Sequence, residues 1–117
     1  MVNELLKYKY IKSNISKKWL IENGFHYDKL LSTEKDIYVY NFSVHKYKKY
    51  SVLTCRLSID LNSGIVGIDV YDESGELYHP FYFVSYGDFK PLLDPVNKKI
   101  YKKLKELGIK RIMKSCK

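Results

Sequence analysis

Residues 50–61, with the sequence YSVLTCRLSIDL, alternate between apolar and polar side chains, and this pattern constrains the fold more than any other feature. Side chains of one parity are apolar: Leu53, Cys55, Leu57, Ile59 and Leu61. A period of two predicts a β-strand with one buried face and one polar face. The turn sequence NSG follows at 62–64, and the apolar segment IVGIDVYD at 65–72 comes directly after it. The two segments are therefore expected to form an antiparallel hairpin.

Two further segments have the composition of strands. Residues 36–47 place Tyr38, Tyr40, Phe42 and Val44 on one face, and residues 77–86 are rich in aromatic side chains. Pro80 lies within the second segment and cannot donate to a sheet ladder, so this strand should begin after Pro80, bulge there or lie at an edge. Because the links between the four segments are short, the sequence predicts an antiparallel meander.

A first helix is predicted within residues 13–25. Its N-cap is one of three residues that the sequence leaves open: Ser13, Asn14 or Ser16. Gly24 follows the last turn and suits the left-handed position that ends many helices, while Phe25 can fold back onto that turn.

A second helix is predicted from Asp94, as the N-cap, to Gly108, which ends it. Pro95 would then occupy the first helical position, where its missing N–H costs nothing. A narrow apolar stripe follows at helical spacing: Val96, Ile100, Leu104 and Leu107. Burying these side chains predicts a helix that is docked on the sheet.

The combined prediction is one α+β domain over residues 1–117, with a four-stranded antiparallel meander sheet and the N-terminal and C-terminal helices packed on one face. Two parts stay open. Residues 1–12 suit either a helical turn or a strand, and residues 109–117 are expected to form a short strand or a frayed end.

The positive charge is concentrated near the C-terminus. Residues 98–117 contain nine Lys or Arg residues against Glu106 alone, whereas the charges of residues 1–97 sum to zero. The acidic residues gather around the hairpin at 64–76. The protein is therefore expected to be polarised in charge, with a positive helix and an acidic hairpin edge.

The positive cluster has two interpretations. It is either a solvated helix face enriched in lysine by AT-rich codons, or a surface for an acidic partner. The candidate partner-binding cations are Lys98, Lys99, Lys102, Lys103, Lys105, Lys110 and Arg111. With two arginines in the chain, reading of base edges in DNA is not expected, because that task favours the arginine fork.

The twelve tyrosines suggest a second binding element. If helices cover one sheet face, an open face rich in tyrosine could bind a partner, because tyrosine buries a large area at low entropic cost. Tyr38, Tyr40 and Tyr82 are the candidates for this face, although their strand propensity alone also accounts for them.

No pattern points to catalysis. His26, His45 and His79 share no metal-ligand spacing with one another or with the two cysteines, and the chain lacks a glycine-rich phosphate loop and a serine elbow. We therefore expect no enzyme, no cofactor and no metal, although a site assembled from distant residues stays an alternative. No apolar run reaches 18 residues and no signal peptide is evident, so a cytoplasmic location is expected.

These features favour a small non-enzymatic protein that binds a protein or nucleoprotein through the basic helix, the tyrosine-rich sheet face, or both. The skew toward residues with AT-rich codons suggests a phage- or plasmid-encoded inhibitor of a host complex that handles nucleic acid. The alternative is a sequence-tolerant nucleic-acid-binding protein with lysines on phosphates and tyrosines on bases.

Overall fold

Six strands form the sheet, two more than the sequence predicts. The structure is a computed structural model and describes residues 3–48, 50–82 and 90–114. In the labels used here, η marks a 3₁₀ helix and α an α-helix. Along the chain the elements are η1 (Glu4–Lys7), β1 (Tyr8–Ile11), α1 (Lys17–Glu22), β2 (His26–Tyr27), β3 (Ile37–Tyr47), β4 (Tyr50–Asp60), β5 (Ile65–Asp72), η2 (His79–Phe81), α2 (Lys90–Glu106) and β6 (Lys110–Lys114). The α+β class is confirmed, whereas the four-strand count is wrong.

The central hairpins match the prediction closely. β3, β4 and β5 are consecutive antiparallel strands within a sheet of order β2-β3-β4-β5-β1-β6, and every pair in it is antiparallel. β1 and β6 extend the sheet beyond β5, so the open N-terminal segment contains both a 3₁₀ turn and a strand. Of the two alternatives that the sequence leaves open for residues 109–117, the structure has the strand, β6, over Lys110–Lys114.

The sequence predicts a strand over residues 77–86, and this prediction is wrong for residues 77–82, which contain one isolated bridge followed by η2. The rest of the expected strand lies outside the described residues. Pro80, inside η2, has no N–H for a ladder. The segment instead covers the edge of β5. The backbone N–H of Tyr78 donates to the carbonyl of Val70 at 2.8 Å, and Phe81 is fully buried.

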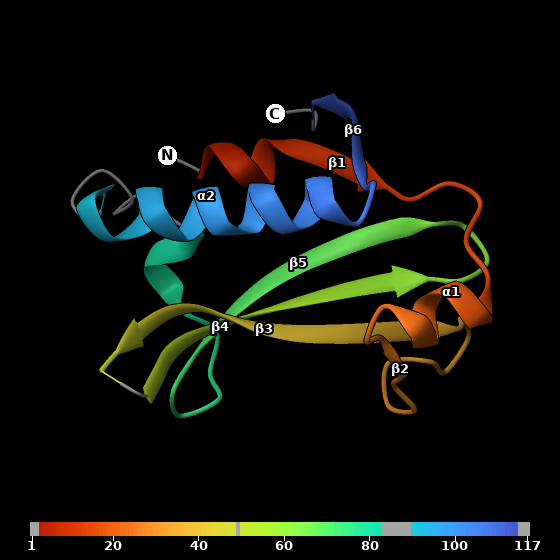
Figure 1. The fold of residues 1–117 in the computed structure, drawn as a ribbon, viewed down its shortest axis with the longest axis horizontal. Helices are drawn as coiled ribbons and strands as arrows, with labels where there is room; N and C mark the ends of the chain where they lie inside the picture. The colour runs from red at the N-terminus through yellow and green to blue at the C-terminus, as the bar shows by residue number, and fades with distance from the viewer. Residues whose placement is uncertain (1–2, 49, 83–89, 115–117) are drawn as a thin grey trace.

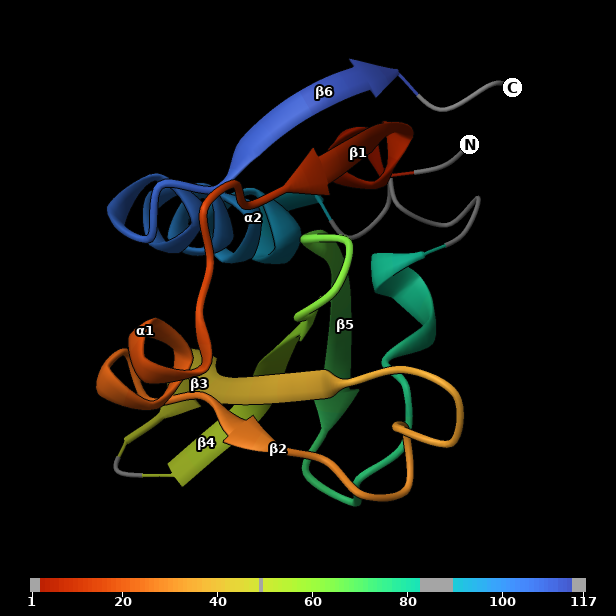
Figure 2. The same cartoon turned by 90° about the vertical axis from the view of Figure 1, so that its right-hand side faces the viewer.

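The arrangement of the helices also differs from the prediction. Figures 1 and 2 show that the sheet bends, so that β1 and β6 lie on one side of α2 while β3 and β4 lie on the other. α2 therefore occupies the concave side of the sheet rather than one flat face. α1 packs farther along the same side, where the ring centroids of Phe25 and Tyr40 are 5.4 Å apart.

Local signals at the helix ends are mostly confirmed. Ser16 is the N-cap of α1, and its hydroxyl accepts from the N–H of Trp19 at 3.1 Å. Gly24 follows with a φ of +88°, and the N–H of Phe25 donates back to Leu20 at 2.9 Å. Gly108, with a φ of +72°, ends α2 as expected.

The predicted start of α2 is wrong. The helix begins at Lys90, so that Pro95 lies inside it rather than at the first helical position. A proline there removes the bond to the carbonyl of Pro91, but Pro91 is exposed and its carbonyl can be hydrated. The cap motif at Asp94 was therefore a false local signal.

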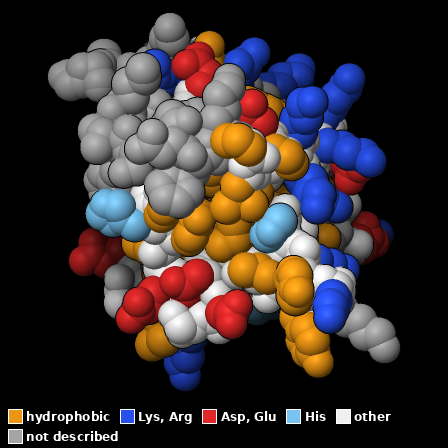
Figure 3. All heavy atoms as spheres, turned by 90° about the vertical axis from the view of Figure 1, so that its left-hand side faces the viewer, with side chains coloured by type: hydrophobic (Ala, Val, Ile, Leu, Met, Phe, Trp, Pro, Cys, Tyr) orange, Lys and Arg blue, Asp and Glu red, His pale blue; other side chains and the backbone are white. Residues whose placement is uncertain are grey.

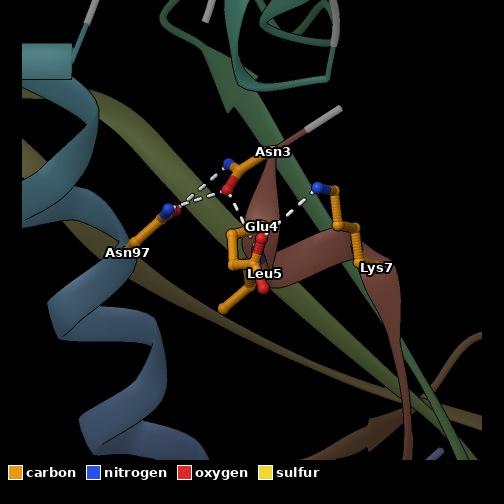
Figure 4. A network of polar contacts seen from close by, with 5 residues as sticks. All are labelled: Asn3, Glu4, Leu5, Lys7 and Asn97. Atoms are coloured by element: carbon orange, nitrogen blue, oxygen red, sulfur yellow. Dashed lines mark hydrogen bonds and ion pairs between the residues drawn. The ribbon is translucent and has the colours of Figure 1, made fainter. Parts of the chain in front are cut away.

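One polar pair lies inside the core, which otherwise consists of apolar side chains from the sheet, α1 and α2. Asn3 is fully buried and Asn97 is 7% exposed, and their side-chain amides form two reciprocal hydrogen bonds of 3.2 and 2.8 Å. The oxygen of Asn3 also accepts from the N–H of Leu5 at 3.1 Å. Figure 4 shows how this pair ties η1 to α2.

Candidate binding surface

The exposed lysines of α2 form a ridge opposite its buried stripe. Val96, Ile100 and Leu104 are buried against the sheet, as predicted. The exposed lysines on the other side are Lys98, Lys99, Lys102 and Lys105, which we call the lysine ridge, and Glu106 is exposed beside them. At 1.5 Å of rise per residue, the ridge spans about 10 Å along the helix axis. Within the described part of the chain, no acidic side chain forms an ion pair with a ridge lysine.

Lys103 differs from the ridge lysines, although it was predicted together with them. Its ammonium lies 5.5 Å from the centroid of the Tyr40 ring and 5.7 Å from that of Phe42, and it is 3.2 Å from a carboxylate oxygen of Glu106. Burial alone would lower the pKa of Lys103, but the bond to Glu106 and the nearby Tyr40 hold this pKa above its usual value. Lys103 therefore fastens α2 to β3 and is less available to a partner.

A shallow hollow of about 290 Å³ lies between α2 and β3. It is lined by Phe42, Ser43, Lys99, Lys102, Lys103 and Glu106. Two ridge lysines thus line a concave surface together with Lys103 and Glu106, so the cations of the lining outnumber its one carboxylate.

Lys110 and Arg111 lie apart from this hollow, on β6. Both are exposed, and the guanidinium carbon of Arg111 lies 4.3 Å from the centroid of the Tyr8 ring. Arg111 is also paired in register with Tyr10 of β1. The candidate cations therefore divide into the ridge on α2 and a smaller group near β1 and β6.

The expectation that Tyr38 and Tyr40 line an open sheet face is wrong. In the β3–β4 register, Tyr38 is opposite Ile59 and Tyr40 is opposite Leu57, so both tyrosines lie on the buried face. Tyr38 is 5% exposed. The periodicity grouped the residues correctly, but it could not indicate which face the helices cover, because both faces of β3 contain apolar residues.

Tyr82 also has a structural position. Its hydroxyl donates to a carboxylate oxygen of Asp69 at 3.0 Å and accepts from the N–H of Val70 at 2.9 Å. Burial raises the pKa of Tyr82 strongly, and the bond from Val70 offsets part of that effect. The side chain therefore attaches the segment after η2 to the edge of β5.

Two other tyrosines are exposed at the tip of the β3–β4 hairpin. Tyr47 and Tyr50 are cross-strand partners and are 65% and 73% exposed. Lys46 is exposed beside them, and the ammonium of Lys48 lies 5.6 Å from the centroid of the Tyr47 ring. This tip is absent from the predicted binding residues, although a tyrosine on each side of a predicted turn is a signal that the sequence contains.

Charge is polarised on the surface, as the sequence predicts. Figure 3 shows one face on which Lys and Arg side chains gather along one side and Asp and Glu side chains gather at another, with hydrophobic side chains between them. The turn after β5 is one acidic segment. There the Asp72 carboxylate accepts from the hydroxyl of Ser74 at 2.6 Å and from the N–H of Glu76 at 3.1 Å, and these bonds lower its pKa. Asp72 is therefore part of the turn structure.

Among residues 3–48, 50–82 and 90–114, no group of three or more His, Cys, Asp or Glu side chains is placed to hold a metal ion. In the same ranges, no helix combines the length and the apolar character needed to cross a membrane.

Comparison with known proteins identifies the fold alone. No protein-family model matches the sequence, and no curated protein matches it significantly. The structure is similar to a crystal structure of a DUF1831 family protein from Lactobacillus plantarum, with a TM-score of 0.59 and 12% sequence identity. The similarity covers 88% of this chain and 86% of that chain. At this identity the two proteins share an architecture, and nothing about function follows from it.

Proposed function

We propose that the protein is a non-enzymatic binding protein that holds an acidic macromolecular partner against the lysine ridge. The observation that carries this proposal is the ridge itself. Its four ammonium groups are exposed, and no acid of the described residues pairs with them. A helix face that served solubility alone would gain from alternating Glu and Lys, which avoids self-repulsion. The adjoining hollow beside Ser43 adds a concave contact surface.

The leading partner is an acidic protein or nucleoprotein surface. Lysine ammonium groups on a rigid, docked helix would increase the rate of encounter with such a surface. A narrower form of this proposal is an inhibitor, carried by a mobile element, that occupies a groove meant for DNA or RNA. Affinity capture from host lysate should then yield one acidic protein or nucleoprotein, and a variant with the ridge reversed should lose it.

A specific observation favours single-stranded nucleic acid as the second candidate. Tyr47 and Tyr50 are exposed side by side at the hairpin tip, next to lysines. Aromatic side chains beside cations bind single strands without sequence preference, because every base can stack. Replacing either tyrosine by alanine should weaken binding roughly tenfold, whereas Tyr27→Ala, at another exposed tyrosine, should not.

Fluorescence anisotropy with labelled single-stranded DNA, duplex DNA and RNA at several salt concentrations separates the two candidates. If about four phosphates are neutralised, log K should fall against log salt with a slope of about −3. A variant with Lys98, Lys99 and Lys102 changed to Glu should lose this binding.

The matched control changes the exposed residues Lys17, Lys18 and Lys29 to Glu, which alters the net charge equally. Equal losses in both variants would indicate net charge rather than a built surface, and would contradict the proposal. No binding to any nucleic acid, together with specific capture of a protein, would favour the leading partner.

A further inference from the structure

A second hollow, of about 540 Å³, lies between the last turns of α2 and the strands β1 and β6. Its volume is within the range typical of small-molecule sites, roughly 300–1,000 Å³. Its lining consists of Tyr10, Tyr101, Leu104, Lys105, Ile109 and Arg111. The hollow lies where the bent sheet brings β1 and β6 over the C-terminal half of α2.

The apolar part of the hollow is set by the end of the helix. Leu104 is 3% exposed and Ile109 is 6% exposed. The chain reverses at Gly108, and the N–H of Ile109 donates to the carbonyl of Leu104 at 2.8 Å. The backbone therefore holds these two side chains beside each other, and the small exposed part of each lines the hollow.

Tyr10 and Tyr101 add aromatic surface to the hollow but few hydrogen-bond donors for a ligand. The hydroxyl of Tyr10 donates to the carbonyl of Leu5 at 2.7 Å. Burial raises the pKa of both phenols, so both stay neutral at ordinary pH. A ligand would therefore find its charged partners elsewhere.

Those partners are the two cations of the lining. Lys105 and Arg111 are both exposed, so their charged groups remain accessible to a ligand. The guanidinium of Arg111 lies against the Tyr8 ring, and the backbone of Arg111 is paired in register with Tyr10. Among the described residues, no acidic side chain lines the hollow. The nearby carboxylate of Glu4 is 3.4 Å from the ammonium of Lys7.

We propose that this hollow binds a small amphipathic carboxylate. Its chain or ring would pack on Leu104 and Ile109, and its carboxylate would interact with Lys105 and Arg111. The guanidinium fork matches the two oxygens of a carboxylate, and an apolar site with a few placed polar groups is the usual form of a small-ligand pocket. This site is separate from the part of the lysine ridge used in the anisotropy test.

Titration of the ¹⁵N-labelled protein with octanoate tests the proposal, with 1-octanol as the neutral probe of equal chain length. We expect saturable shifts confined to residues around Leu104, Ile109 and the start of β6, and binding at least tenfold weaker for octanol. Lys105→Gln and Arg111→Gln should each weaken octanoate binding by roughly tenfold, because each removes a charge-assisted contact.

Lys99→Gln, on the opposite side of α2, is the matched control and should leave octanoate binding unchanged. The proposal is overturned by the absence of saturation at millimolar octanoate, by equal binding of octanol, or by shifts centred elsewhere. The variant with Lys98, Lys99 and Lys102 changed to Glu should still bind octanoate. Loss of macromolecular binding in that variant is thus distinguishable from failure of this site.

Discussion

The amide pair inside the core allows a quantitative test of the fold. Replacing Asn97 by alanine removes both hydrogen bonds that join it to Asn3, and it leaves the fully buried Asn3 amide without them. An unsatisfied buried polar group costs about 1–3 kcal/mol, and alanine regains roughly 0.6 kcal/mol of helix propensity. The free energy of unfolding should therefore fall by about 0.5–2.5 kcal/mol, and Tm by roughly 2–10 °C.

Urea unfolding followed by circular dichroism measures this change, and the m-value should stay constant. In a double-mutant cycle with Asn3→Ala, the double variant should lose about 1 kcal/mol less than the sum of the single variants, because either single change already breaks both bonds between the two amides. Asn41→Ala, at an exposed position on β3, is the control and should change stability by less than about 0.5 kcal/mol. A loss below about 0.5 kcal/mol for Asn97→Ala, with no coupling, would refute the reasoning.

Three further predictions concern single side chains. Tyr82→Phe removes the hydroxyl that attaches the segment after η2 to β5, and urea unfolding should show a loss of about 1–3 kcal/mol. Gly64→Ala would place a Cβ 2.4 Å from the carbonyl oxygen of Lys12 at a φ of +79°, so it should cost more than about 2 kcal/mol, and a neutral result by thermal unfolding would argue against the β1–β5 connection. Cys55 is fully buried and burial raises the pKa of its thiol, so in a Cys116→Ser variant Ellman's reagent should react with Cys55 at the rate of unfolding, and rapid labelling of that native variant would contradict this placement.

The parts of the fold that the sequence predicts are those determined by neighbouring residues. The bounds of β5 follow from turns and side-chain alternation, and the cap at Ser16 is one of the three candidates that the local sequence offers. β1 and β6 have no such local determinant. Each is short, and each becomes a strand because a distant segment lies beside it.

The exposure of the candidate binding residues on α2 was also predictable where neighbouring residues determine it. Helical periodicity places Lys98 and Lys102 opposite the buried stripe, so their exposure follows from the sequence. Periodicity cannot show that Lys103 lies over two aromatic rings, nor which face of β3 is covered, because both depend on how α2 meets the sheet. Asp94 and Pro95 have the sequence of a helix start, but α2 begins at Lys90, so this local signal did not determine where the helix starts.

The position of β1 between β5 and β6 has a consequence for folding kinetics. Asn3 and Asn97 are 94 positions apart in the chain, and the β1–β6 register joins similarly distant residues. Closing such a loop costs entropy before any contact compensates for it, and proteins rich in distant pairings fold slowly. The hairpins of β3, β4 and β5 have short loops and should form first. β1 gains its second sheet partner only when β6 docks, so formation of the amide pair between η1 and α2 should be among the last steps of folding.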